Sequence, residues 1–277
     1  MSGRAILVLM ALGLPGCASL QALMGNQRPS AKLEDVRFTG LSLSGLEISF
    51  DARVDNPYDV DLPLVALDLV LSNGDTPLLQ SRLDQGASIP AADSKRFTVP
   101  ARLEFAGLLK TLQDLKPGGI IPYRADIGVS LDAPVLGRIR IPLQHRGEIG
   151  VPVPPKVSVK DVQLARIGLT EIRAEAVIEA ESSNGFPIEL STFDAAFNVR
   201  NRALARSRIT SPLALSPGGK ASWTVPISIN PIEAGQVFVT LFRADDLAYG
   251  LDGQLSFGTP FGRLSAPVAI DGRAPLR

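Results

Sequence analysis

The chain has few of the residues from which metal sites and acid–base catalysts are usually built. Its 277 residues include one histidine, His145, and one cysteine, Cys17. Zinc sites take three or four protein ligands, mostly histidine and cysteine, and a disulfide takes two cysteines. The sequence therefore excludes an internal disulfide and predicts no metal and no cofactor. No nucleophile is marked near His145, so we do not expect it to act as a catalytic base.

Aromatic residues and excess charge are scarce as well. Aromatic residues make up 5% of the chain, and 28 basic residues balance 28 acidic ones. Proteins that bind nucleic acid present a basic surface and often stack bases on aromatic rings, so we expect no nucleic-acid partner. The spacing motifs of α/β-hydrolases, zinc proteases and dinucleotide-binding folds are absent. Gly218-Gly219-Lys220 lacks the rest of a phosphate-binding loop and predicts a turn, so we do not expect an enzyme.

The apolar run near the start, Ala5–Leu14, is too short for a membrane-spanning helix, which needs about 20 residues. It follows Arg4 and precedes Pro15-Gly16-Cys17, in the order typical of a secretory signal. Leu14 to Cys17 resembles a bacterial lipobox, which implies a signal peptide at 1–16 and lipid on Cys17. An ordinary signal with a coincidental cysteine is the alternative.

The residues after the lipobox bear on location. Ala18 follows Cys17, whereas an aspartate at this position retains Gram-negative lipoproteins in the inner membrane. The resemblance therefore implies a lipid anchor in the outer membrane, on its periplasmic face. Residues 17–33 have little to bury and are predicted to be a partly flexible tether.

The chain is rich in internal repetition. Residues 34–152 and 157–272 share one pattern at a spacing of 126 residues. The matches include Val36 with Val162, Leu64 with Leu190, Leu67 with Phe193, Leu71 with Phe197, and Phe97–Pro100 with Trp223–Pro226. A shape that is kept twice with different polar groups indicates a scaffold or binding module. We predict domains at 34–150 and 157–277, joined by a semi-rigid, proline-rich linker at 151–156.

Alternating apolar and polar residues dominate both repeats, as in strands with one buried face. The clearest runs extend from Leu46 to Val54 and from Ile172 to Ala180, and turn signals separate such runs. The pattern predicts a mainly β protein with one antiparallel sandwich per repeat. One helix is predicted in each repeat from apolar residues at i, i+3, i+4 and i+7: Phe105, Leu108, Leu109 and Leu112 in the first, and Ala234, Val237, Phe238 and Leu241 in the second.

The densest polar segment, Asp55–Asp61, follows the first alternating run. Its carboxylates suggest a calcium loop, but it lacks the central glycine and closing glutamate of an EF-hand. We interpret it as a turn in which Asn56 bonds nearby backbone and Pro57 fixes φ. Asn56-Pro57, with Leu62 and Leu64 in the next strand, resembles the WHy (water stress and hypersensitive response) domain of type 2 late-embryogenesis-abundant proteins. The second repeat has no such Asn-Pro pair.

This resemblance implies two tandem fibronectin-III- or immunoglobulin-like antiparallel β-sandwiches, each with one short α-helix, no catalytic residues, and a link to desiccation or other stress. We therefore expect a non-enzymatic envelope lipoprotein that protects client proteins, through its sheet edges or its apolar patches. One alternative is an envelope adaptor that binds one protein partner. Another is a carrier of lipid or another apolar ligand between the sheets, where Ala174, Ala176 and Ala180 could leave space.

Overall fold

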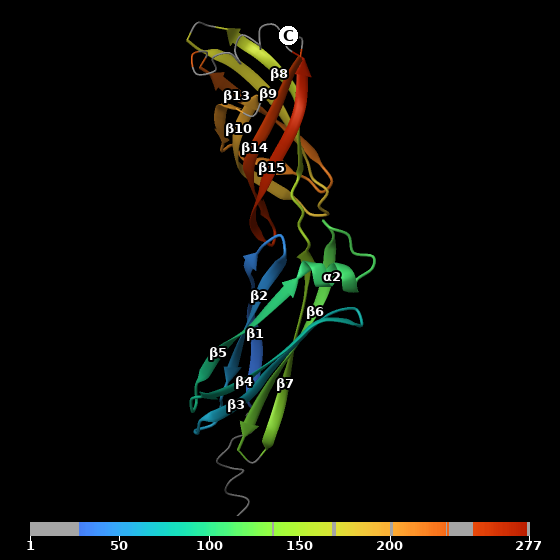
Figure 1. The fold of residues 1–277 in the computed structure, drawn as a ribbon. Coiled ribbons are helices and arrows are strands. Elements are labelled where there is room, and N and C mark those ends of the chain that lie inside the picture. Colours follow the sequence, from blue (N-terminus) through green and yellow to red (C-terminus); the bar gives the residue numbers. More distant parts are fainter. Residues whose placement is uncertain are drawn as a thin grey trace, which may run out of the picture.

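The computed structural model describes residues 28–134, 136–167, 170–199, 202–230, 232 and 246–275. Over these residues the chain forms two antiparallel β-sandwiches that lie end to end, the first in blue to green and the second in yellow to red (Figure 1). Each sandwich packs a three-stranded sheet against a larger one, with the apolar faces between them. The predicted fold class is confirmed.

The first sandwich contains the strands that the first repeat predicts. Its three-stranded sheet has the order β1 (Ser30–Leu41), β2 (Gly45–Asp55), β5 (Ser94–Glu104). Its four-stranded sheet has the order β4 (Thr76–Ile89), β3 (Leu62–Asn73), β6 (Ile120–Ala133), β7 (Gly137–Gly150). Because β1 already pairs with β2 from Ser30 onward, the prediction of a tether is wrong for residues 30–33, which belong to the sandwich.

The second sandwich repeats this arrangement. One sheet has the order β13 (Lys220–Ile229), β9 (Ile172–Glu181), β8 (Lys156–Ile167). The other has the order β11 (Arg202–Ile209), β10 (Ile188–Val199), β14 (Asp246–Thr259), β15 (Gly262–Pro275), and β12 (Leu213–Leu215) also pairs with β10. Even the register repeats, since Ala52 lies opposite Phe97 in the first sandwich and Ile178 lies opposite Trp223 in the second.

The alternating pattern of β2 predicts its buried face correctly but not its outer face. Every apolar residue at alternate positions from Leu46 to Val54 is fully buried. Ser49 and Asp51, which were expected to face water, are also buried, at 8% and 5% exposure. The reason is cover from neighbouring strands: Thr98 Oγ1 donates a hydrogen bond to the Asp51 carboxylate at 2.6 Å, and Arg37 pairs with the same carboxylate.

Small residues on β9 are matched by large ones across the core. Ala174, Ala176 and Ala180 are 5%, 4% and 0% exposed. Phe193 on β10 stacks on Trp223 of β13, with ring centroids 6.4 Å apart and planes inclined by 20°. These alanines and both rings belong to one cluster of buried residues, so small and large side chains share the core between the sheets.

The helix predicted in the first repeat is present as α2 (Phe105–Thr111), with Phe105 and Leu108 buried. Its last residue is Thr111, and Leu112, the last residue of the predicted apolar pattern, is its C-cap. The helix predicted in the second repeat, around Ala234 to Leu241, lies outside the described residues. Within the described part of the chain, no helix combines the length and apolar character needed to cross a membrane.

Candidate functional site

The loop after β2 is held by one buried amide, Asn56, which is 3% exposed. Its Nδ2 donates to the carbonyls of Val60, Ile89 and Pro90 at 2.8, 3.1 and 2.9 Å. Its Oδ1 accepts the Tyr58 N–H at 3.0 Å. Buried backbone groups need such partners, so this one side chain fixes the shape of the loop and ties it to the end of β4.

The other residues of the motif are structural as well. Leu62 and Leu64 open β3 and face the core at 0% and 2% exposure, and Pro57 is half-buried next to Asn56. Two of the three acids considered as calcium ligands have protein partners: Asp55 accepts from Arg53 Nε at 3.0 Å, and Asp61 accepts the Ala91 N–H at 3.2 Å. Among the described residues, no group of three side chains is placed to hold a metal ion.

The same loop of the second sandwich keeps the backbone frame but moves the amide. The N–H of Ser182 donates to the carbonyl of Gly219 at 2.9 Å, as the N–H of Asn56 donates to that of Asp93 at 2.8 Å. Ser182 therefore occupies the place of Asn56. The buried amide of this loop comes from Asn184, which is 1% exposed.

Asn184 reaches out of its own loop to the linker between the sandwiches. Its Oδ1 accepts the Val153 N–H at 2.9 Å, and its Nδ2 donates to the Val153 carbonyl, also at 2.9 Å. The linker is thus held against the second sandwich by a two-way bond. The sequence analysis missed Asn184, because the residue aligns with Tyr58 and not with Asn56 of the first repeat.

The loop after α2 holds the linker from the other side. Gly118 N–H donates to the Val151 carbonyl at 2.7 Å, and Val151 N–H donates to Gly119 at 3.0 Å. Gly185 N–H, from the second sandwich, donates to the Gly118 carbonyl at 2.7 Å. Gly118 has φ +84°, and a Cβ there would lie 2.5 Å from the Ser183 carbonyl oxygen. Only glycine fits this contact.

Aromatic rings complete the junction. Phe261 packs edge-on against Phe38 and Phe186, with centroids 5.4 and 5.2 Å apart. A Cβ on Gly150 would lie 2.3 Å from the Phe261 ring, so the bare backbone of Gly150 makes room for the aromatic pair. Edge-to-face pairs contribute about 0.5–1.5 kcal/mol each beyond the area they bury. The two sandwiches therefore meet through packed and hydrogen-bonded groups.

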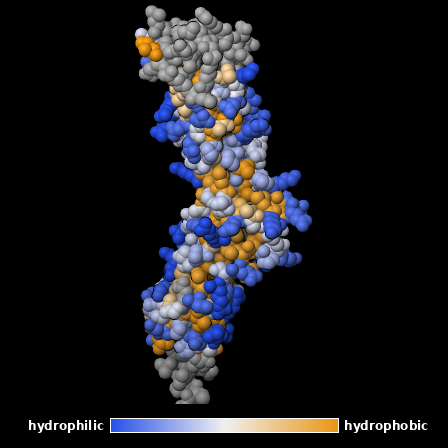
Figure 2. Space-filling model, viewed as in Figure 1, coloured by the Kyte–Doolittle hydropathy of each residue, from blue (hydrophilic) through white to orange (hydrophobic). Residues whose placement is uncertain are grey.

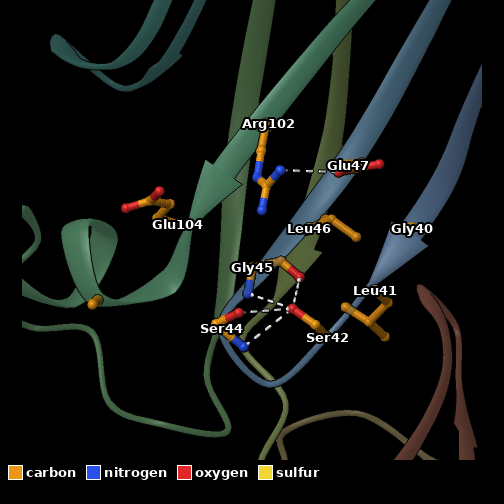
Figure 3. Close-up of a pocket in the computed structure, with 10 residues that line it drawn as sticks. Gly40, Leu41, Ser42, Ser44, Gly45, Leu46, Glu47, Arg102 and Glu104 are labelled. Atoms are coloured by element: carbon orange, nitrogen blue, oxygen red, sulfur yellow. Dashed lines mark hydrogen bonds and ion pairs between the residues drawn. The ribbon is translucent and has the colours of Figure 1, made fainter.

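A hollow of about 480 Å³ lies beside the junction, under the turn between β1 and β2. Figure 3 shows the hydrogen bonds that converge on Ser42 Oγ, which accepts the N–H groups of Ser44 and Gly45 at 3.2 and 3.0 Å. Arg102 reaches toward Glu47, at 3.6 Å between Nη1 and Oε1. The Ser42 hydroxyl is thus used to build the turn, and the charged pair is exposed. Neither group is placed as a nucleophile beside a base.

A wider groove of about 710 Å³ separates this turn from the outer face of the second sandwich. Its lining mixes hydroxyl and apolar side chains: Leu41, Ser42, Leu43, Ser44, Ser191, Thr192, Ser256, Phe257, Arg263, Leu264 and Ser265. Several hydroxyls are already engaged, since Ser256 and Ser265 share a hydrogen bond of 2.8 Å and Ser191 donates to the Ser256 carbonyl at 3.1 Å. The groove is open and lined by side chains with local partners.

His145 lies in an aromatic setting. Its ring centroid is 6.4 Å from that of Phe50 and 6.0 Å from that of Tyr123. Burial raises the pKa of the Tyr123 hydroxyl, and the same ring covers Gly147, where a Cβ would lie 2.8 Å from the Tyr123 oxygen. These contacts pack the sheet end, and they bring no reactive group to His145.

Two further sequence predictions concern the glycine-rich segment at Gly218 and the lipidation of Cys17. Gly218 has φ +64°, and Lys220 pairs with Glu181 at 3.1 Å, so the glycine-rich segment is a turn as predicted. Cys17 lies outside the described residues, and its lipidation stays a prediction.

The fold and the loop geometry define a class: tandem fibronectin-III-like sandwiches in which the motif amide supports backbone and the motif leucines pack in the core. A family model described as late embryogenesis abundant protein matches residues 51–147 and again residues 183–272. The chain belongs to this family, and the sequence resemblance to its type 2 members is confirmed.

The relatives each match about one repeat of this chain. The "Desiccation protectant protein Lea14 homolog" of Glycine max is 29% identical over 125 residues, which cover 45% of this chain and 82% of that protein. A desiccation-related protein of Arabidopsis thaliana is 27% identical over 124 residues, or 45% and 75% of the two chains. The solution structure of an Arabidopsis thaliana late embryogenesis abundant protein has 24% identity and a TM-score of 0.38, covering 48% of this chain and 84% of that one.

Proposed function

We propose that the protein is a non-enzymatic, stress-related protectant of the cell envelope, anchored through lipid on Cys17, that shields partly unfolded proteins during water loss. The observation that carries this proposal is the family match to both sandwiches. It is supported by relatives whose names describe desiccation protection or a relation to desiccation. The loop geometry agrees with it, because the polar side chains of the motif are bonded to backbone and are not aimed at a substrate.

The surface best suited to shielding is apolar and lies at the junction. Among the described residues, Phe38, Leu43 and Ile120 are exposed at 36%, 43% and 37%. Phe38 packs on Phe261, Leu43 lines the groove between the sandwiches, and the Ile120 side chain lies near Gly185. Figure 2 shows apolar surface concentrated at the narrow middle of the molecule and continuing onto the first sandwich. Exposed apolar area of this kind is typical of protein-binding surfaces.

Protection can be tested by drying the full chain with a desiccation-sensitive enzyme at a one-to-one ratio. We expect more activity to be recovered after rehydration than with an equal mass of serum albumin. A Leu43→Ser/Ile120→Ser variant should lose most of this gain, since it removes apolar contact area. Leu136→Ser is the matched control, because Leu136 is 49% exposed on the turn between β6 and β7, away from the junction. Recovery no better than with albumin would overturn the proposal.

The lipid anchor needs its own experiment. Cells fed an alkyne-bearing fatty acid should label the wild-type protein, and Cys17→Ser should lose the label and the membrane association. Ser19→Ala is the matched control and should keep both. An Ala18→Asp variant should move from outer- to inner-membrane fractions. An unlabelled wild-type protein would mean that the leader is an ordinary secretory signal.

Crosslinking in cells separates protection from the adaptor function. Many weakly bound clients whose number grows on drying would support protection, whereas one stoichiometric partner that does not change would support an adaptor. Lipid that co-purifies at a fixed ratio would support a carrier. The carrier has less structural support, because the β9 alanines are buried in the same core cluster as the aromatic rings of β10 and β13.

A further inference from the structure

The edges of the four sheets carry an arrangement that core packing does not explain. An edge strand exposes unpaired N–H and C=O groups to which another chain can add a strand. Two sandwiches have four sheets and therefore eight edges. In the part of the chain that the structure describes, those edges are β1, β5, β4 and β7 in the first sandwich and β8, β13, β11 and β15 in the second.

Four of the edge strands contain a proline near the middle. Pro100 of β5 lies opposite Ser49, and Pro226 of β13 occupies the equivalent place opposite Glu175. Pro142 of β7 lies opposite Gly128, and Pro267 of β15 has the equivalent place in the second sandwich, opposite Gln254. Proline has no N–H to give to a further strand.

All four proline rings are exposed to solvent. Burial in the core therefore does not account for their position. β-branched residues fit strands better than proline, so proline at these places costs local propensity. Both repeats nevertheless have it on the same two edges, while most of their polar residues differ.

The edges β1 and β8 are interrupted in another way. Each carries two bulges against its neighbour, with the extra residues at Glu34 and Thr39 in β1 and at Lys160 and Ala165 in β8. Bulges twist and break the regular spacing on which a continuous ladder depends. Glu34 and Lys160, at equivalent places, also carry charges, which are costly to cover with another strand.

The two remaining edges, β4 and β11, are also broken at equivalent places. β4 has a bulge at residues 85–86 against β3 and another at Leu78. β11 has a bulge at residue 204 against β10, and it stops at Ile209 before the chain resumes as β12 at Leu213. Pro212 lies in this gap. No described edge therefore offers an unbroken row of donors and acceptors along its length.

We propose that the eight edges are built to block strand addition, so that the chain stays monomeric at very high protein concentration and its contacts with other proteins run through side chains. The inference rests on the strand registers and on the exposure of the prolines, and it is independent of any protective activity. It also removes strand addition from the ways in which a client could be held.

The test restores single donors on the edges. Pro142→Val and Pro267→Val, alone and together, are made in the full chain with Cys17→Ser in every sample, so that no acyl chain drives association. Sedimentation velocity over a wide concentration range should show the reference chain as a monomer. Each single variant should associate within this range, and the double variant at a roughly tenfold lower concentration than either, because each restored N–H adds hydrogen bonds across an edge-to-edge contact.

Two controls keep the outcome interpretable. Pro217→Val changes an exposed proline in the turn before β13 and should leave the chain monomeric. Where a valine variant does not fold, as judged by circular dichroism, alanine at the same position restores the N–H with less strain. Folded proline variants that sediment as the reference chain does would overturn the inference, as would a reference chain that already pairs through its edges.

Discussion

The two sandwiches solve one packing problem with their bulk in opposite places. In the first, Phe50 on β2 and Leu67 on β3 are both fully buried and belong to one core. In the second, the residue equivalent to Phe50 is Ala176, and the residue equivalent to Leu67 is Phe193. Because cores tolerate such exchanges when the total volume is kept, the repeats could diverge inside while the register stayed the same.

A second difference concerns where the loop amide is used. In the first sandwich Asn56 closes its own loop, whereas in the second Asn184 binds the linker. The buried amide of the second sandwich therefore has a different task, which is to hold the linker between the sandwiches. The second repeat thus lacks the Asn-Pro motif in its sequence, yet its loop still contains a buried amide, two residues further along the chain.

The largest expected loss of stability comes from removing aromatic bulk from the first core. Phe50→Ala should destabilise the first sandwich by about 3–5 kcal/mol, because it leaves a cavity in a fully packed core. Adding Leu67→Phe, which copies the second sandwich, should recover part of this loss. Hydrogen exchange, analysed separately for each sandwich, measures the unfolding free energy of both variants. The idea of exchanged bulk fails if the double variant is less stable than Phe50→Ala alone.

Removing the buried amide of Asn56 should have the second largest effect on stability. Asn56→Ala leaves three carbonyls and one N–H without their partner, and we expect a loss of about 3 kcal/mol in the unfolding free energy of the first sandwich. Asn56→Asp should be at least as harmful, since a carboxylate cannot donate to the carbonyls of Val60, Ile89 and Pro90. The loss is measured by chemical denaturation, followed by hydrogen exchange at the backbone amides of the first sandwich. An effect spread equally over both sandwiches would contradict a local role.

The sequence predicted the strands well because their alternation is a local property. Every residue at alternate positions from Leu46 to Val54 is buried as expected, and Asn56 bonds nearby backbone as its type suggests. The burial of Asp51 was missed, because it depends on Thr98 and Arg37 from strands on either side. No local pattern records what a neighbouring strand places over a side chain.

The junction could not be predicted for the same reason. Asn184 and Gly118 lie 66 residues apart in sequence, and both acquire their roles only when the linker lies between them. Pro117-Gly118-Gly119 and Asn184-Gly185 have the composition of ordinary turns and loops. Only the fold shows that their backbone groups also carry the contact between the sandwiches.

Asn184→Ala tests that contact. It should cost about 1–2 kcal/mol, less than Asn56→Ala, because only the Val153 backbone and Ser182 lose a partner. Its specific effect should be on geometry: amide exchange at Val153 should accelerate, and residual dipolar couplings should show the sandwiches reorienting. Asn56→Ala serves as the control and should leave the couplings between domains unchanged. Unaltered couplings in folded Asn184→Ala would mean that the aromatic contacts fix the junction alone.

The smallest expected effect concerns an ion pair with its signs reversed between repeats. In the first sandwich Glu34, on β1, pairs with Arg53 on β2; in the second, Lys160 on β8 pairs with Glu179 on β9 at 2.9 Å. Hydrogen bonds from Arg96 lower the pKa of Glu34, and those from Lys160 lower the pKa of Glu179. Glu34 and Glu179 are themselves only 19% and 21% exposed, but their basic partners reach into solvent, which screens each pair, so each contributes little.

The pH dependence follows from the sign of those shifts. A carboxyl whose pKa is lower in the folded state stabilises the fold above its unfolded pKa, and this contribution is lost as the pH falls through the folded value. Unfolding midpoints of the wild type should therefore drop on the acid side of the ordinary glutamate range. Glu34→Gln should flatten the drop for the first sandwich only, and Glu179→Gln for the second only. The double variant Glu34→Lys/Arg53→Glu copies the charge arrangement of the second sandwich. It should restore the slope only if the carboxylate at residue 53 has a further cationic neighbour, as Glu179 has in Lys220. If none of the three variants changes the pH dependence of unfolding, the charges at the bulges do not stabilise the sheet, and their role is to hinder pairing at the sheet edge.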